Sequence, residues 1–419
     1  MAVSSNIMKH LSLLFTFLLL HTLVCAQEPD VHLVRYPFVR YHLNQIHIPG
    51  DSAAYLRLTE KLNTQFETHA GQINIVQIGG SHVQADIWTS RMRENLNRFF
   101  VQPESSRGII FPYKAIKTNG ALQYDVSYNK HWEGLRNVRL LQPDRIGLMG
   151  WKATARDSGQ YIDITLKGDT VSRFVFNRLR IFHEAGDSIF SFTLSIQDST
   201  YYPVYHDTCY CSEFSFPDLH NQFRITVHKT DTAQQEFVLH GIQTILDQPS
   251  VTYHSIGVNG ASVGSYLNCM LFENQLAFLQ PDLIIFSIGI NDSFGKDFTQ
   301  SAFEASYSEL IRRIKTTCPN ATLLFVTNTD SYKKYRKKFY KNPKGKEVQS
   351  AMFNLAREHG GAVWDLFEVM GGFGSIATWK RNGLASRDLI HLSRKGYLLT
   401  GDLMFDALIQ SLRNPATQP

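Results

Sequence analysis

A serine in the first quarter of the chain stands where a nucleophile could be exposed. Residues 73–78 form a short apolar run typical of a buried strand, the run ends in Gly79-Gly80, and Ser81 then begins a helical pattern. Open α/β sheets bind ligands at the carboxyl ends of their parallel strands, and a backbone N–H at a helix start is free to meet negative charge. Serines are also common helix N-caps. From this segment alone, the N-cap is the favoured interpretation.

A carboxylate and an imidazole lie three residues apart near the other end of the chain. Asp388 precedes His391 in a predicted loop, which leads into a helical pattern at residues 395–409. An aspartate can accept from one imidazole nitrogen and fix the tautomer, and the other nitrogen can then deprotonate a serine hydroxyl. Such pairs are frequent in ordinary loops, so the spacing is weak support by itself. Because no G-x-S-x-G elbow surrounds Ser81, an α/β-hydrolase fold is not indicated.

An acyl-transfer enzyme also needs donors for the negative charge that develops on the carbonyl oxygen. Gly260 follows the apolar run 251–257 and can present its backbone N–H without obstruction. Asn291 follows the run 283–288 and offers a side-chain amide. Each segment alone is a commonplace strand-end turn. Together with Ser81, they predict that donors gather at one edge of a sheet.

These segments resemble a known family. Gly79-Gly80-Ser81-His82, Gly260, Gly289-Ile290-Asn291-Asp292 and Asp388-x-x-His391 are similar, in order, to the four blocks of the SGNH/GDSL hydrolases. The resemblance implies that Ser81 is the nucleophile, His391 the general base and Asp388 its orienting partner. It also implies an oxyanion hole made by the N–H groups of Ser81 and Gly260 and the Asn291 amide. One departure concerns Gly80, since the family usually has an aspartate there, which puts geometry or rate in doubt.

The tail of the chain is most similar to bacterial peptidoglycan O-acetylesterases with an inserted β domain. The similarity lies in Val363-Trp364-Asp365-Leu366, in Met370-Gly371-Gly372 with Trp379, and in Gly396-Tyr397 after the histidine. It implies an exported serine esterase that removes O-acetyl groups from a polysaccharide, with peptidoglycan first and plant-type xylan, xyloglucan or pectin as alternatives. A glycan-binding protein with a weakened hydrolase site, and transfer of acetyl to a sugar, also remain open.

Two kinds of pattern alternate along the chain. Strand and helix patterns alternate before residue 118 and after residue 247, which predicts a mostly parallel sheet with helices on both faces. Short strands separated by turn residues fill the segment between, which predicts a β-sandwich or jelly roll. The fold class is therefore α/β, an SGNH-type three-layer sandwich interrupted by an all-β insert. The predicted divisions are a signal peptide at 1–26, hydrolase parts at 27–117 and 248–419, and an inserted β-sandwich at 118–247, which could bind carbohydrate.

The N-terminus predicts export. Lys9 and His10 precede the apolar residues 11–24, and Val24-Cys25-Ala26 offers a cleavage site. We favour cleavage after Ala26 over a retained anchor, because the apolar run is too short for a membrane span. Lipidation of Cys25 is disfavoured by the bulky Val24. Because the leader contains Lys9 and no acidic residue, its loss lowers the net charge from +5 to +4.

That charge predicts neither nucleic-acid nor stable membrane binding. The chemistry needs no cofactor, and a metal site is not expected, because Cys209 and Cys211 lack a second pair. The pairing of the four remaining cysteines stays open, although buried thiols are the favoured interpretation for Cys269 and Cys318. The oligomeric state is open as well.

Residues 331–346 hold eight Lys or Arg residues interleaved with tyrosine and phenylalanine. Tyrosine rings stack on sugars and cations attract carboxylates, so this segment could grip an acidic glycan. We favour a solvated loop followed by a helix start. Histidines 82 and 254 are interpreted as structural, and His82 is expected only to help hold the turn after Ser81.

Overall fold

The apolar runs of the sequence become the strands of one sheet in the computed structural model, which describes residues 35–413. The predicted leader lies outside the described residues. The sheet has six strands in the order β1-β22-β19-β18-β2-β17. Five are parallel, and β1 is antiparallel to β22, so the sheet is mixed. In this order the strands are Ile46–His47, Ala362–Trp364, Thr322–Val326, Leu283–Ser287, Gln72–Gly79 and Ser250–Gly257.

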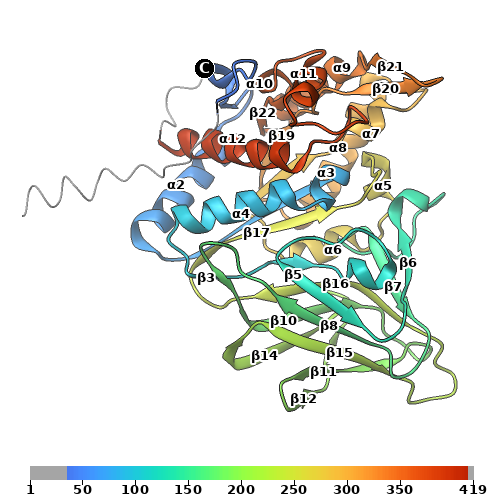
Figure 1. Ribbon diagram of the computed structural model, residues 1–419. Coiled ribbons are helices and arrows are strands. Elements are labelled where there is room, and N and C mark those ends of the chain that lie inside the picture. The colour runs from blue at the N-terminus through green and yellow to red at the C-terminus, as the bar shows by residue number, and fades with distance from the viewer. Residues whose placement is uncertain (1–34, 414–419) are drawn as a thin grey trace, which may run out of the picture. The chain divides into compact units, whose positions relative to one another are not determined.

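Helices cover both faces of this sheet (Figure 1). On one face lie α2 (Ala53–Thr68), α4 (Ile87–Phe99) and α12 (Arg394–Arg413), and on the other lie α8 (Gln300–Thr317) and α9 (Lys344–His359) with α5 (Val263–Leu267) and α6 (Phe272–Ala277). Successive strand residues point to opposite faces. The alternation is visible in β18 and β19: Ile284, Phe286, Leu323 and Phe325 belong to the hydrophobic cluster that includes residues of α8 and α9, whereas Ile285 and Leu324, equally buried, do not.

Shorter elements join the strands and helices at the edges of the sheet. The short α-helices are α3 (Ser81–Gln84), α7 (Ile290–Ser293), α10 (Leu366–Val369) and α11 (Ser375–Arg381). Single 3-10 turns are formed by Tyr41–Leu43, Tyr113–Ile116 and Asn137–Arg139. Among the residues from 35 to 413, no helix combines the length and the apolar content needed to cross a membrane.

Two antiparallel sheets account for the short strands in the middle of the chain. One has the order β13-β14-β10-β16-β7-β6, with β4 also paired to β16, and the other has the order β12-β11-β15-β8-β5. In the same orders, the first contains Tyr205–His206, Cys211–His220, Phe176–His183, Phe237–Ile245, Trp151–Ala155 and Glu133–Arg136, with β4 at Ile109–Ile110. The second contains Ser199–Tyr201, Ser191–Ile196, Gln222–His228, Tyr161–Leu166 and Tyr124–Tyr128. A separate small pair joins β3 (Glu104–Ser105) to β9 (Arg173–Phe174).

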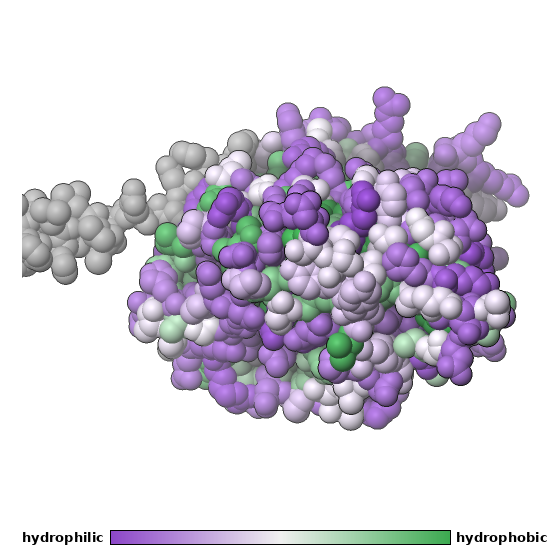
Figure 2. Space-filling view, turned by 90° about the horizontal axis from the view of Figure 1, so that it is seen from below, coloured by the Kyte–Doolittle hydropathy of each residue, from purple (hydrophilic) through white to green (hydrophobic). Residues whose placement is uncertain are grey.

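The two β sheets share their hydrophobic core with the α/β part. Buried and partly exposed residues alternate along β8 and β11, so each strand buries one face. Seen from below, the surface is mostly hydrophilic, and hydrophobic residues are scattered over it (Figure 2). The buried residues join one cluster that runs from Phe192 and Phe237 to Val76 and Phe286. The fold is therefore mixed α/β with substantial β content, and the division at residues 118 and 247 stays a prediction.

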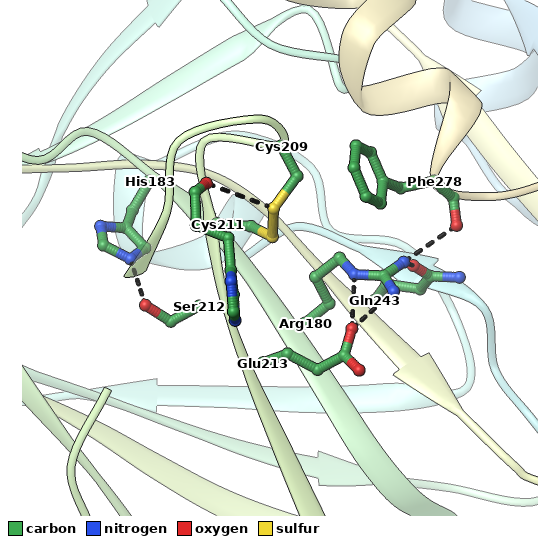
Figure 3. Close-up of a disulfide and its surroundings, with 9 residues drawn as sticks. Arg180, His183, Cys209, Cys211, Ser212, Glu213, Gln243 and Phe278 are labelled. Carbon is green, nitrogen blue, oxygen red and sulfur yellow. Dashed lines mark hydrogen bonds and ion pairs between the residues drawn. A yellow bond between two sulfur atoms is a disulfide. The ribbon is translucent and has the colours of Figure 1, made fainter. Parts of the chain in front are cut away.

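Three local features differ from the sequence expectations or complete them. Cys209 and Cys211 form a disulfide at the start of β14 (Figure 3). Cys269 and Cys318 are free and buried. Residues 331–346 are not an open loop: β20 (Tyr332–Tyr335) and β21 (Lys338–Lys341) form a hairpin before α9 begins. In α2 the aromatic residue Phe66 is not part of the core, since it is 44% exposed and stacks on Phe99.

Candidate active site

The carboxyl ends of the neighbouring parallel strands β18, β2 and β17 meet at one edge of the six-stranded sheet. Gly79 at the end of β2 pairs in register with Gly257 of β17 and with Ser287 of β18. The segments that carry Ser81, Gly260 and Asn291 leave the sheet within four residues of these positions. Sequence-distant polar groups are thereby brought to the same edge.

A chain of two hydrogen bonds joins three of the predicted site residues. Ser81 Oγ lies 2.8 Å from His391 Nε2, and His391 Nδ1 lies 2.7 Å from Asp388 Oδ2. The imidazole is 39% exposed and the Asp388 side chain 46%, so the arrangement is open to solvent. A charged Asp388 accepts from Nδ1–H, which leaves Nε2 as the acceptor of the serine hydroxyl proton.

The loop around Asp388 holds its carboxylate in the charged form. Partial burial works against ionisation, but hydrogen bonds from His391 Nδ1 and Ser386 Oγ, with the backbone N–H groups of His391 and Ile390, keep the pKa of Asp388 well below its usual range. Oδ1 accepts from Ser386 Oγ at 2.6 Å and from the two N–H groups at 3.0 and 2.9 Å. Four donors on one carboxylate fix the orientation in which it meets the imidazole.

The predicted oxyanion donors are arranged around the Asn291 side chain. Asn291 Nδ2 donates to the Ala261 carbonyl at 2.9 Å, and a Cβ built on Gly80 would lie 3.2 Å from the same nitrogen. The amide is therefore flanked by the chain neighbours of Gly260 and Ser81. Within residues 35–413, no protein acceptor receives the N–H of Ser81 or of Gly260. These two N–H groups are therefore unpaired among the described residues, as donors to a substrate oxygen must be, and their role in an oxyanion hole stays a prediction.

Glycine is required where the sheet meets α3. A Cβ on Gly257 would lie 2.2 Å from the backbone nitrogen of Gln84, and a Cβ on Gly79 would lie 2.4 Å from Val83 Cγ2. A Cβ atom does not come this close to a non-bonded heavy atom in folded proteins. Only glycine at these two positions therefore allows α3 to pack against the strand ends. This close approach sets the position of Ser81 at the start of α3.

His82 and Tyr397 form a second pair beneath the imidazole. Tyr397 Oη and His82 Nδ1 are 2.9 Å apart, and the rings of His82 and His391 have centroids 5.3 Å apart. Burial, reinforced by the neighbouring His391, lowers the pKa of His82 to about 3, so this histidine stays neutral. His82 packs under the candidate base and holds it, in agreement with a structural role. Its partner was missed by sequence reasoning, although Tyr397 stood in a quoted motif.

A buried ion cluster, which no sequence pattern indicated, anchors the end of the α3 turn. Asp86 contacts Arg93 Nη2 and Arg107 Nη2, each at 2.5 Å, and accepts from the Leu122 N–H at 2.9 Å. Burial opposes its charge, but Arg107 and Arg93 hold the pKa of Asp86 below its usual value. Asp86 therefore stays ionised at the C-terminal end of the segment that begins with Ser81.

In the part of the chain that the structure describes, no three His, Cys, Asp or Glu side chains are grouped so as to hold a metal ion. His254, expected to be structural, is buried in β17, where Nδ1 accepts from the Ile109 N–H at 3.1 Å.

One segment of the chain matches a known protein family. Residues 225–399 match the model of the GDSL-like Lipase/Acylhydrolase family. The match includes Gly260, Asn291, Asp388 and His391, whereas Ser81 precedes it and is placed beside them by the fold. No curated protein matches the sequence.

One solved structure shares the fold over most of its length, and two others are similar to part of it. A structure of a peptidoglycan O-acetylesterase is 21% identical with a TM-score of 0.73, and the alignment covers 88% of this chain and 99% of that one. An acetyl xylan esterase is 20% identical with a TM-score of 0.31, over 38% of this chain and 81% of its own. A family two carbohydrate esterase from Cellvibrio japonicus is 12% identical with a TM-score of 0.26, over 69% and 99%. Residues 225–399 are thus similar to the GDSL-like lipase/acylhydrolase family, and the chain shares its fold with a peptidoglycan O-acetylesterase.

Proposed function

We propose that this protein is an exported serine esterase that removes O-acetyl groups from a polysaccharide through an acetyl-serine intermediate. The observation that carries the proposal is the hydrogen-bonded chain from Ser81 Oγ through His391 to Asp388. An unactivated serine is a weak nucleophile, and an imidazole at hydrogen-bond distance is the group that activates it.

In the first half of the reaction, Ser81 Oγ attacks the acetyl carbonyl while His391 Nε2 takes the hydroxyl proton. The N–H groups of Ser81 and Gly260 and the Asn291 amide stabilise the oxyanion of the tetrahedral intermediate. The imidazolium, stabilised by Asp388, then gives its proton to the departing sugar hydroxyl. In the second half, His391 activates a water that attacks the acetyl-serine and releases acetate. No step uses a cofactor.

We propose an O-acetylated glycan as substrate, with peptidoglycan first. Support comes from the fold shared with a peptidoglycan O-acetylesterase over nearly all of that protein's length. Acetylated xylan, xyloglucan and pectin are the alternatives to be compared with it. The open position of His391 and Asp388 is compatible with a polymer, because a side group of a long chain can reach them without the chain entering a cavity.

We further propose that residues 118–247 form a unit inserted into the α/β part and that this unit contributes to glycan binding. A groove of about 560 Å³ on the five-stranded sheet supports this, with polar residues such as Thr165 and Gln222 along it. Because the core is shared, deletion of the unit would unfold the protein. Point variants Thr165→Ala and Gln222→Ala, compared in glycan pull-down, are the appropriate test, and unchanged binding would refute the role.

Export is proposed from residues 1–26 alone. The protein recovered from expressing cells should begin at Gln27 and be found outside the cytosol. A full-length chain that stays in the cytosol would contradict the proposal.

The esterase proposal is tested with two variants, a small chromogenic ester and four acetylated glycans. Ser81→Ala and His391→Ala should abolish acetate release from a chromogenic acetyl ester. Wild-type protein should release acetate from O-acetylated peptidoglycan faster than from acetylated xylan, xyloglucan or pectin. Full activity of Ser81→Ala would refute the site, and acetate appearing on an added sugar instead of in solution would identify a transferase.

A further inference from the structure

The hairpin of β20 and β21 carries a concentration of positive charge that the proposed reaction does not use. Residues 331–346, which we call the basic hairpin, contain eight Lys or Arg residues and no Asp or Glu. The strands pair from Tyr332 opposite Lys341 to Tyr335 opposite Lys338. In Figure 1 they project beyond α7 at the same end of the molecule as α5 and α9.

This charge is not neutralised within the described part of the chain. None of the eight cations forms an ion pair with a described carboxylate, although ion pairs are numerous elsewhere. Several lie over aromatic rings instead: Lys333 is 5.4 Å from the Phe294 ring, and Lys341 is 5.0 Å from the Phe373 ring. The acidic group beside Lys341 is Asp330, which is buried and accepts from the Ile376 N–H.

Aromatic rings on the basic hairpin are also exposed. Tyr335 is 61% exposed, Tyr340 is 51% exposed and Phe339 is 38% exposed. Large aromatic side chains gain free energy from burial, so rings left in water mark a surface that a ligand can cover. Flat rings beside cations suit a sugar chain that carries carboxylates.

Hydrogen bonds tie the basic hairpin to the candidate active site. The Tyr332 N–H donates to the carbonyl of Leu389, which lies between Asp388 and His391, at 3.0 Å. At the same end of the hairpin, Asn342 Nδ2 donates to the Oγ of Ser293, a residue two positions after Asn291, at 3.0 Å. A polymer lying on the hairpin would therefore pass the edge where Ser81 is presented.

We propose that the basic hairpin is a docking surface for a glycan that carries carboxylates, and that it selects acidic over neutral acetylated polysaccharides. The biological role of this surface rests on the proposed esterase function, but the binding experiment that tests it needs no esterase activity. Cations attract the carboxylates and exposed rings cover sugar faces. Because exposed charges are screened over about 8–10 Å at physiological salt, the selection weakens as salt rises.

Binding is measured first, with a protein that cannot turn over substrate. Ser81→Ala protein is incubated with peptidoglycan sacculi, polygalacturonate and neutral xylan, and the bound fraction is determined at low and high salt. The hairpin variant adds Lys334→Gln, Lys337→Gln and Lys338→Gln. The matched control adds Arg57→Gln, Arg98→Gln and Arg312→Gln, which remove the same charge from exposed positions on α2, α4 and α8, outside the proposed glycan-binding unit.

The hairpin variant should bind both acidic glycans at least about tenfold more weakly at low salt, whereas the control should bind like the parent. Equal losses in both variants, or no preference of the parent for acidic glycans over xylan, would overturn the inference. Tighter binding of a single-stranded RNA than of either acidic glycan would also overturn it.

Activity separates this inference from the esterase proposal. In the background with Ser81 intact, the hairpin changes should lower the ratio of kcat/KM on O-acetylated peptidoglycan to that on the small chromogenic ester. If wild-type protein releases no acetate from any glycan but the binding difference persists, the proposed substrate is wrong and the docking surface stands.

Discussion

Replacing Asn291 by alanine tests the oxyanion arrangement. Asn291 Nδ2 has two hydrogens, and one of them goes to the Ala261 carbonyl at 2.9 Å, which leaves the other for a substrate oxygen. Loss of one preorganised donor costs roughly 10²–10³ in kcat, about 2.7–4 kcal/mol. The N–H groups of Ser81 and Gly260 remain, so the variant should keep a measurable rate above that of Ser81→Ala.

The same substitution also removes the partner of the Ala261 carbonyl. A lost hydrogen bond of this kind contributes about 1 kcal/mol to stability, so the melting temperature should fall by only a few degrees. Initial rates on a chromogenic acetyl ester give kcat and KM, and Asn354→Ala, on the exposed surface of α9, is the control for loss of an asparagine. A folded Asn291→Ala protein with less than about threefold loss of kcat would refute the proposed oxyanion hole.

Three further predictions concern neighbouring groups. Asp388→Asn keeps an acceptor for the loop N–H groups but stabilises the wrong imidazole tautomer. The kcat on the small ester should therefore fall about 10³–10⁴-fold, with little change in melting temperature. An unchanged kcat would exclude the orienting role of Asp388. Gly257→Ala places a methyl against the Gln84 backbone and should lower the free energy of unfolding by about 1–3 kcal/mol in urea titration, and an unaltered midpoint would contradict the close packing. Burial raises the pKa of Asp292 from 3.8 to about 6, so its contribution to stability is complete below about pH 4 and is lost as the pH rises through 6. Asp292→Asn should remove that fall in thermal melts across pH 4–8, and an unchanged slope would show that another group titrates.

The parallel strands could be predicted because they are buried on both faces. Residues 73–78 and 283–288 are short and mostly apolar, and the observed β2 and β18 differ from them by one residue at the ends. Polar residues directly after such runs must lie at one edge of a parallel sheet. Ser81 and His391 are 310 positions apart in the sequence. Their proximity follows from the topology of the sheet, which the order of the sequence blocks allowed us to predict.

Elements whose stability comes from tertiary contacts could not be predicted. The strand β1 has two residues, too few for any periodic pattern. The hairpin of β20 and β21 is rich in Lys, a residue depleted in strands, and it is anchored at its base by Tyr332 and Asn342. Hydrophobic patterns in a sequence indicate which faces are buried. Because this hairpin is mostly exposed, it leaves no such pattern.

Pairings between polar side chains that are distant in the sequence could not be predicted from sequence patterns either. The contacts of Asp86 with Arg93 and Arg107, and of His82 with Tyr397, depend on how the helices pack on the sheet. The Cys209–Cys211 disulfide was one of three pairings that the cysteine count allowed, and only the turn before β14 brings those two together. The core shared between the β sheets and the α/β part could not be predicted either, because it also depends on how the elements pack.

The most direct test of the central claim is covalent labelling of Ser81. A fluorophosphonate reacts with a serine only when a base has activated its hydroxyl and oxyanion donors receive the phosphoryl oxygen. Digestion and mass spectrometry of labelled wild-type protein should place the label on Ser81, and His391→Ala should lose it. A label on another serine, or equal labelling of Ser81 in His391→Ala, would contradict the assignment of this hydrogen-bonded chain as the catalytic apparatus.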